Sequence, residues 1–218
     1  MAASPRGVQV NCVPIVADVA PCPQGYVRTI RSSTDIPRLR CPHCGRLLQR
    51  RGRYQRWASE RRRDVRLTVF RQYCPECGKC RGVLPAFLRP YARYVTLLRE
   101  TVARARALCG DTLERAHARV STEDGGVSRR TVQRWWAEIQ ARAPVARDAL
   151  AEQLVRLSPA VNPVDVVAEG PIGDAVVALL HLGRAYRRQF WARMADRRAW
   201  AVGLFGLYNA QGWASLML

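Results

Sequence analysis

The stretch that decides the fold is a repeated cysteine motif, "CPHCG" at residues 41–45 and "CPECGKC" at residues 74–80. Two Cys-x-x-Cys turns supply four thiolates, the ligand set that a structural zinc ion prefers. A glycine follows the second cysteine of each motif, where a positive φ directs backbone N–H groups toward sulfur. We therefore expect one structural Zn²⁺ ion held by Cys41, Cys44, Cys74 and Cys77, with Cys80 as the alternate ligand.

The residues between the two motifs predict a β-hairpin. In "DVRLTVFRQY" at 64–73, the apolar Val65, Leu67 and Val69 alternate with other residues, which is the period of a strand. Residues 52–57 can form its partner strand. Together with the cysteine turns, this hairpin predicts a small zinc ribbon over residues 36–83.

The charge of the chain indicates a polyanionic partner. Its 36 Lys and Arg against 17 Asp and Glu give a net charge of +19. The codon usage of a GC-rich genome would also enrich arginine, but it would spread arginine evenly along the chain. Residues 28–142 instead hold 27 basic and 10 acidic side chains, so nearly all the excess lies in one segment. Arginine in such a segment typically neutralises nucleic-acid phosphates.

A helix-turn-helix-like region is expected at residues 84–142. The apolar pattern predicts a helix over 91–108, and Asp111 with Glu114 predicts the start of a second helix, which runs to about residue 119. Residues 121–126 predict a loop. Ser128 then caps a helix over 128–140, whose apolar stripe has helical spacing. The stripe consists of Val132, Trp135, Trp136 and Ile139.

The polar face of that last helix is the candidate reader of DNA bases. Arg130, Gln133 and Arg134 can contact base edges, and Arg129 in the first turn is placed for phosphate. The three arginines of the predicted hairpin loop, Arg61, Arg62 and Arg63, are candidate phosphate contacts. The alternative is an ordinary amphipathic helix whose charged face meets water. The loop at 120–127 is also longer than the turn of a tight helix-turn-helix, which favours a looser variant.

The two ends of the chain are less informative. Residues 1–35 are an N-terminal extension, with no export signal, and a cytoplasmic protein that does not enter the membrane is expected. Residues 143–218 predict C-terminal helices at 143–157, 174–193 and 200–218, with a linker at 158–173. This segment can cap the fold or form a homodimer. The expected fold class is α+β.

Several motifs carry a family resemblance. "GRYQRW", "LPAFLRPYARY" and "VSRRTVQRWW", together with the cysteine turns, cover about residues 36–140. In these residues the chain resembles bacterial zinc-ribbon and helix-turn-helix proteins of an uncharacterised domain family. That family is related to the N-terminal DNA-binding part of insertion-sequence transposases. The resemblance implies a zinc-dependent DNA-binding module that is transposase-derived or resembles a transcription regulator.

No catalytic residue is expected. A transposase needs three carboxylates that hold two metal ions, and the acidic residues beyond 142 are scattered over predicted helices. The sequence therefore predicts a protein that is not an enzyme, whose partner is double-stranded DNA and which is associated with the nucleoid. Two alternatives stay open: an accessory or remnant recombinase subunit that works with a separate catalytic subunit, and a zinc ribbon that binds RNA or protein.

Overall fold

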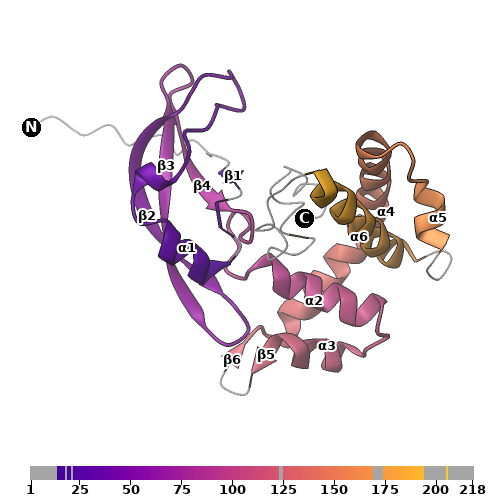
Figure 1. Ribbon diagram of the computed structural model, residues 1–218. Coiled ribbons are helices and arrows are strands. Elements are labelled where there is room, and N and C mark those ends of the chain that lie inside the picture. The colour runs from indigo at the N-terminus through magenta and orange to yellow at the C-terminus, as the bar shows by residue number, and fades with distance from the viewer. Residues whose placement is uncertain are drawn as a thin grey trace, which may run out of the picture.

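The computed structural model describes residues 14–17, 19–20, 22–122, 125–168, 174–193 and 205, and it has the α+β architecture that the sequence predicts. Figure 1 shows the sheet on one side and most helices on the other. The sheet region contains β1 (Ile15–Ala17), α1 (Pro23–Thr29), the 3-10 turn η1 (Ser33–Asp35), β2 (Gln49–Ser59), β3 (Asp64–Cys74) and β4 (Lys79–Pro85). The helical region contains α2 (Thr96–Ala107), α3 (Leu113–Val120), the short strands β5 (Ser121–Thr122) and β6 (Gly125–Gly126), α4 (Arg129–Leu157), α5 (Pro163–Ala168) and α6 (Ala175–Arg193).

The main sheet has the strand order β1-β4-β3-β2. The long antiparallel hairpin of β2 and β3 confirms the predicted pairing of these two segments, and its register places Ala58 opposite Val65. The register shifts between Arg50 and Arg53, where Gly52 has a φ of +70° that a side chain would strain. Strand β4 pairs antiparallel with β3, and β1 pairs parallel with β4.

The residues before position 36 help to build the sheet region. Tyr26 on α1 is buried, its Oη donates to the carbonyl of Thr68 on β3 at 2.9 Å, and its ring meets Phe87 edge to face. The surrounding core also takes in residues from α2 and α4, so the sheet and the first helices share one hydrophobic cluster. Its large members include Tyr26, Leu67, Phe70, Phe87, Leu88, Val102, Val132 and Trp135.

Helix α2 begins later than the sequence predicts. The expected start was residue 91, but residues 89–94 form an irregular loop and α2 begins at Thr96. Two backbone bonds to Ser59 at the end of β2 hold the loop against the sheet region: Ser59 donates to the carbonyl of Arg93, and Val95 donates to the carbonyl of Ser59. A bridge between Leu88 and Val95 brings the two ends of the loop together. These backbone bonds, together with the left-handed φ of +60° at Tyr91, prevent the earlier helix start.

The connection from α3 to α4 also differs in detail. Thr112, rather than Asp111, caps α3, because its side chain accepts the backbone N–H of Arg115. The segment predicted as a loop carries the small β5–β6 hairpin, in which Ser121 pairs with Gly126. Ser128 caps α4 as predicted, and its side chain accepts from the backbone N–H of Thr131.

The predicted break between helices at 128–140 and 143–157 is wrong, because α4 runs unbroken from Arg129 to Leu157 with Pro144 inside it. Proline costs this helix one backbone hydrogen bond, yet buried residues recur at helical spacing through the whole length. Burial of this continuous stripe outweighs the lost bond. The stripe consists of Val132, Trp135, Ile139, Ala143, Ala146, Leu150 and Leu154. The predicted boundary at 142/143 therefore falls inside one helix.

The C-terminal half of α4 packs against α6, and α5 lies within the segment predicted as a linker. A second hydrophobic cluster fills this contact and includes Ile139, Leu150, Leu154, Leu179, Leu182, Tyr186 and Phe205. Apart from Phe205, the predicted helix at 200–218 lies outside the described residues. Within the described ranges, no helix combines the length and the apolarity needed to cross a membrane.

Candidate metal centre and the basic surface beside it

The first cysteine turn lies on the strand-like segment that precedes β2. Arg40 and Leu47 form an antiparallel bridge, which brings the two ends of the turn together. Inside it, Gly45 donates to the carbonyl of Cys41 at 2.8 Å, and Cys41 donates to the carbonyl of Arg46 at 2.7 Å. Gly45 has a φ of +72°, so the tight turn uses the conformation that glycine adopts most easily.

The second cysteine turn connects β3 to β4. Cys74 is the last residue of β3, and the backbone N–H of Cys77 donates to its sulfur at 3.4 Å. Gly78 has a φ of +64° and ends the turn before β4 begins. The β3–β4 pairing, which places Cys74 opposite Lys79, therefore fixes the direction in which this turn presents its sulfurs.

The two turns meet, and their four sulfur atoms all lie within 4.8 Å of one another. The Sγ atoms of Cys41 and Cys77 are 3.8 Å apart, and those of Cys44 and Cys74 are 3.4 Å apart. Four sulfurs bound ~2.3 Å from a tetrahedral zinc ion would lie roughly 3.8 Å from each other. The four cysteines can thus hold a metal ion, and the spacing of their sulfurs suits zinc.

The acid–base properties of the four thiols agree with a cation site. The backbone N–H groups of Cys44 and His43 stabilise the thiolate of Cys41 and lower its pKa to about 6. The neighbouring sulfur of Cys44, followed by burial and the other two sulfurs, raises the pKa of Cys77 to about 12. Crowded thiolates repel each other, and a divalent cation among them would remove that cost.

The other described cysteines lie outside this group. Cys80, the alternate ligand, is on β4 opposite Tyr73 and does not belong to the four-sulfur cluster. Cys22 accepts the backbone N–H of Gly25 at the start of α1, and Cys109 is exposed after α2. His43 is exposed within the first turn. The two Cys-x-x-Cys pairs are therefore the ones that the fold brings together.

Gln72 supports the first cysteine turn from the neighbouring strand. This residue is 2% exposed on β3, and its side chain spans to the segment that leads into Cys41. Its Oε1 accepts from the backbone N–H of Leu39 at 2.9 Å, and its Nε2 donates to the carbonyl of Pro37 at 2.8 Å. The only sequence signal for this role is a glutamine two residues before a ligand, which sequence analysis passed over.

The predicted DNA-reading residues lie on the first turns of α4. Arg130, Gln133 and Arg134 are exposed, while Val132 and Trp135 bury the opposite face in the shared core. Arg129 pairs with Glu114 of α3. The structure therefore places all four predicted residues on a solvent-facing surface, and Arg129 is in addition tied to the preceding helix.

The three arginines of the β2–β3 loop differ in their surroundings. Arg61 donates to the carbonyl of Ala118 at 3.1 Å and to that of Ser121 at 3.4 Å, so it binds the C-terminal end of α3. Arg63 pairs with Glu60 at 3.1 Å. Arg62 is exposed, with no hydrogen bond or ion pair found for its side chain among the described residues. The contact of Arg61 brings the hairpin loop beside the α3–α4 connection, as Figure 1 shows.

We expect Arg61→Gln to destabilise the fold and Arg62→Gln to leave it unchanged. Arg61 supplies charge-assisted bonds to two carbonyls at the end of a helix, worth roughly 1 kcal/mol together at an exposed site. Thermal unfolding followed by circular dichroism should show a lower midpoint for Arg61→Gln alone. Equal midpoints for the two variants would show that the contact contributes nothing.

The fold and the site define an α+β protein with a four-cysteine centre that can bind a metal ion. Residues 41–135 match a family model described as a domain of unknown function, DUF6431. The match begins at Cys41 and ends on α4, so it includes all four cysteines of the centre and the exposed first turns of α4. No curated protein and no solved structure matches the chain.

Proposed function

We propose that this protein is a zinc-dependent DNA-binding protein in which the cysteine centre is a zinc ribbon and α2, α3 and α4 form a loose helix-turn-helix. The observation that carries the proposal is the placement of Arg130, Gln133 and Arg134 on the exposed first turns of a helix whose opposite face is buried. Arginine and glutamine are the side chains that pair with guanine and adenine edges in the major groove.

The packing of the three helices supports this role. Helices α2, α3 and α4 contact one another pairwise, and Ser128 caps α4 at the end that would face the groove. The positive end of the helix dipole lies there as well, which favours phosphate. His117 on α3 bonds through Nε2 to the carbonyl of Val127 at 2.8 Å and so sets the entry into α4. The β5–β6 hairpin lengthens the connection beyond a tight turn.

The hairpin loop of β2 and β3 would add backbone contacts on the same side. Arg61 joins this loop to the end of α3, so the loop lies near the α3–α4 connection. Because Arg61 already binds backbone carbonyls and Arg63 binds Glu60, Arg62 is the loop arginine best placed for phosphate. A contact to phosphate would give affinity without sequence preference.

The zinc ion would be structural in this proposal. Four thiolates complete a tetrahedral shell and leave no position for water or substrate. The ion would hold the first cysteine turn against the β3–β4 turn, at the end of the sheet opposite the β2–β3 loop. The proposal therefore assigns the chain a binding role, whether it derives from a transposase or acts as a regulator.

The test is selection of bound sequences from a random duplex pool by the zinc-loaded protein, followed by fluorescence anisotropy. We expect Arg130→Ala and Gln133→Ala to change the preferred sequence, each at a cost of roughly 1–3 kcal/mol for the preferred site. We expect Arg62→Gln to weaken binding to every duplex sequence by the same factor. It should also reduce the slope of log affinity against log salt concentration by about 1.

Arg156→Gln serves as the matched control, because Arg156 is exposed near the far end of the same helix and pairs only with Glu152 in the described residues. It should bind duplex as the unaltered protein does. If the three site variants bind duplex DNA like this control, the proposed surface is wrong. A preference for structured RNA over duplex DNA at equal salt would instead support an RNA-binding ribbon.

A further inference from the structure

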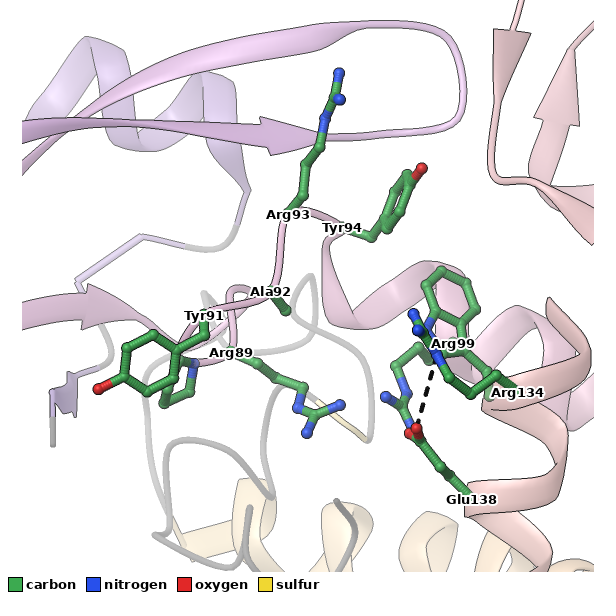
Figure 2. A pocket seen from close by; sticks show the side chains of 10 residues that line it. Arg89, Tyr91, Ala92, Arg93, Tyr94, Arg99, Arg134 and Glu138 are labelled. Carbon is green, nitrogen blue, oxygen red and sulfur yellow. Dashed lines mark hydrogen bonds and ion pairs between the residues drawn. The ribbon is translucent and has the colours of Figure 1, made fainter. Parts of the chain in front are cut away.

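A basic pocket lies between the 89–94 loop and the helices α2 and α4, separate from the cysteine centre. Its volume is about 430 Å³, and Figure 2 shows the side chains that line it. Among the described residues, four arginines line the pocket and Glu138 is the one carboxylate. The arginines are Arg89, Arg93, Arg99 and Arg134. Arg93 is engaged outside the pocket with Ser59 and Asp64, so three arginines remain to face it.

The carboxylate of Glu138 is shared between two of these arginines. Arg99 donates from Nη2 to one oxygen at 3.0 Å, and the Nε of Arg134 lies 3.8 Å from the other. Arg99 is 5% exposed and lies against the ring of Trp135, while Arg134 is exposed. One negative charge therefore faces three positive charges around this pocket.

Arg89 pairs with no carboxylate among the described residues, although its side chain extends into the pocket toward Arg99 and Glu138 (Figure 2). Burial, followed by the positive charge of Arg99, lowers the pKa of Arg89 to about 9. An unpaired cation that is half-buried beside another cation is costly. The Nε atoms of Arg89 and Arg99 are also buried without a hydrogen-bond partner in the described part of the chain.

The wall that carries Arg89 is held in a defined shape. Arg56 of β2 donates to the carbonyl of Arg89 at 2.8 Å and also to that of Ala92. Tyr91, between them, has a φ of +60°, a conformation that a non-glycine residue adopts only when its surroundings impose it. Because the loop is fixed in this way, a ligand would meet Arg89 with little ordering cost.

We propose that this pocket binds a phosphate group, with Arg89 and Arg99 donating to its oxygens and Arg134 at the open side. A phosphate monoester carries about −1.5 to −2 charge at neutral pH, which matches the excess of positive charge left by Glu138. The fork of guanidinium donors also matches phosphate geometry. The inference goes beyond duplex binding by α4 and does not rest on it.

The size of the pocket indicates a phosphate that is part of a larger molecule. Its volume falls within the ~300–1,000 Å³ that is typical of small-molecule pockets. A pocket of this size is larger than an isolated phosphate ion would fill. The phosphate could belong to a mononucleotide or to a nucleic-acid strand whose backbone passes beside Arg134. The same chemistry serves both sources, so the experiment must separate them.

The first experiment uses inorganic phosphate with the zinc-loaded full chain and isothermal titration calorimetry, at an ionic strength balanced with chloride. The unaltered protein should bind phosphate, and Arg89→Gln should weaken that binding by roughly tenfold or more, since it removes charge-assisted donors. Arg156→Gln removes an exposed arginine that is not among the lining residues and that pairs only with Glu152 in the described part of the chain, so it should bind phosphate as the unaltered protein does. No phosphate binding by the unaltered protein, or equal binding by Arg89→Gln, would overturn the proposal.

Two further variants test the charge balance directly. Glu138→Gln removes the one carboxylate that the described residues contribute to the lining, so it should tighten phosphate binding severalfold. Arg134→Gln should weaken it, and because Arg134 is exposed, this variant keeps the test decisive if Arg89→Gln does not fold. Without phosphate, Arg89→Gln should melt no lower than the unaltered protein, because it removes an unpaired charge. Weaker phosphate binding by Glu138→Gln would contradict the proposal that the carboxylate of Glu138 offsets part of the positive charge that attracts phosphate.

The sources are separated by repeating the titrations with a nucleoside 5′-monophosphate and with a short duplex. If the ligand is a mononucleotide, the nucleoside monophosphate should bind more tightly than inorganic phosphate. Arg89→Gln should then lose affinity for the mononucleotide but keep its affinity for the duplex. If the ligand is a nucleic-acid strand, Arg89→Gln should also lower the affinity of the protein for the duplex. The duplex results for Arg130→Ala report on α4 independently, so either proposal can fail while the other stands.

Discussion

The variant Cys74→Ser should bind no zinc and should lose structure at the end of the sheet that holds the two cysteine turns. Cys74 is buried, and its sulfur is one of the four that lie within 4.8 Å of one another. Structural zinc contributes roughly 10–16 kcal/mol of apparent binding free energy in small zinc-finger peptides, which is comparable with the ~5–15 kcal/mol net stability of a whole domain. Loss of any one of the four cysteines is expected to cost more than any other single change.

The loss should be local, because the apolar support of this end is small. The cluster around the cysteines contains one large, fully buried apolar side chain, Leu48, with Ile15 and Leu39 beside it. The far half of the hairpin instead packs in the large core with Tyr26, Leu67 and Phe87. Backbone amides near Cys41 and Cys77 should therefore exchange quickly in Cys74→Ser, while those near Leu67 stay protected.

Metal content and amide hydrogen exchange check this prediction, and Cys80→Ser is the matched control. Cys80 is a partly buried thiol three residues beyond Cys77 but outside the four-sulfur group, so its variant should retain one zinc per chain. Affinity for zinc should fall as the pH is lowered, since protons compete for the thiolates. Loss of zinc from Cys80→Ser, or retention by Cys74→Ser, would contradict the ligand set.

The second large effect is expected at Gln72. Replacement by leucine keeps the volume but removes both bonds to the segment before Cys41, leaving the N–H of Leu39 and the carbonyl of Pro37 without a protein partner. We expect a loss of about 2–3 kcal/mol, because Leu39 is partly buried but Pro37 is exposed to water. The thermal midpoint should fall by roughly 5–10 °C for a chain of this size.

The same change should weaken zinc binding by roughly tenfold, as loss of a partner that orients the ligand segment commonly does. Competition with a chromophoric chelator measures this affinity. Gln55→Leu is the control, because Gln55 is an exposed glutamine in the same hairpin whose side chain bonds only to Thr68 at 3.0 Å among the described residues. It should change stability by less than ~0.5 kcal/mol and leave zinc affinity unaltered. If Gln72→Leu and Gln55→Leu bound zinc with equal affinity, Gln72 would not support the zinc site as proposed.

The candidate metal centre could be predicted from sequence because each half of it is a local turn. Cys41 and Cys44 share one turn and Cys74 and Cys77 another, and the glycines that follow them have the positive φ that the motif predicts. The hairpin of β2 and β3 was predictable for a similar reason, since alternation along a strand reports on its own two faces. The Ser128 cap of α4 also depends on neighbours within three residues.

The use of individual arginines could not be predicted in this way. Arg61, Arg62 and Arg63 are adjacent and chemically identical, yet only Arg61 reaches the end of α3, because the path of the hairpin brings that helix to it. Arg89 and Arg99 looked like members of a general basic segment. Their position around Glu138 depends on how the 89–94 loop, α2 and α4 pack, and no sequence period encodes that packing.

The sequence by itself determined the cysteine quartet, the central hairpin and the start of α4, because turns, alternation and caps act over a few residues. Only the tertiary structure decided that β1 pairs with β4, that α4 continues through Pro144, and that the arginines around Glu138 form a pocket. Each of these features depends on burial or charge shared between distant segments. Such contacts outweigh local preference, as the cost of Pro144 within a buried helix shows.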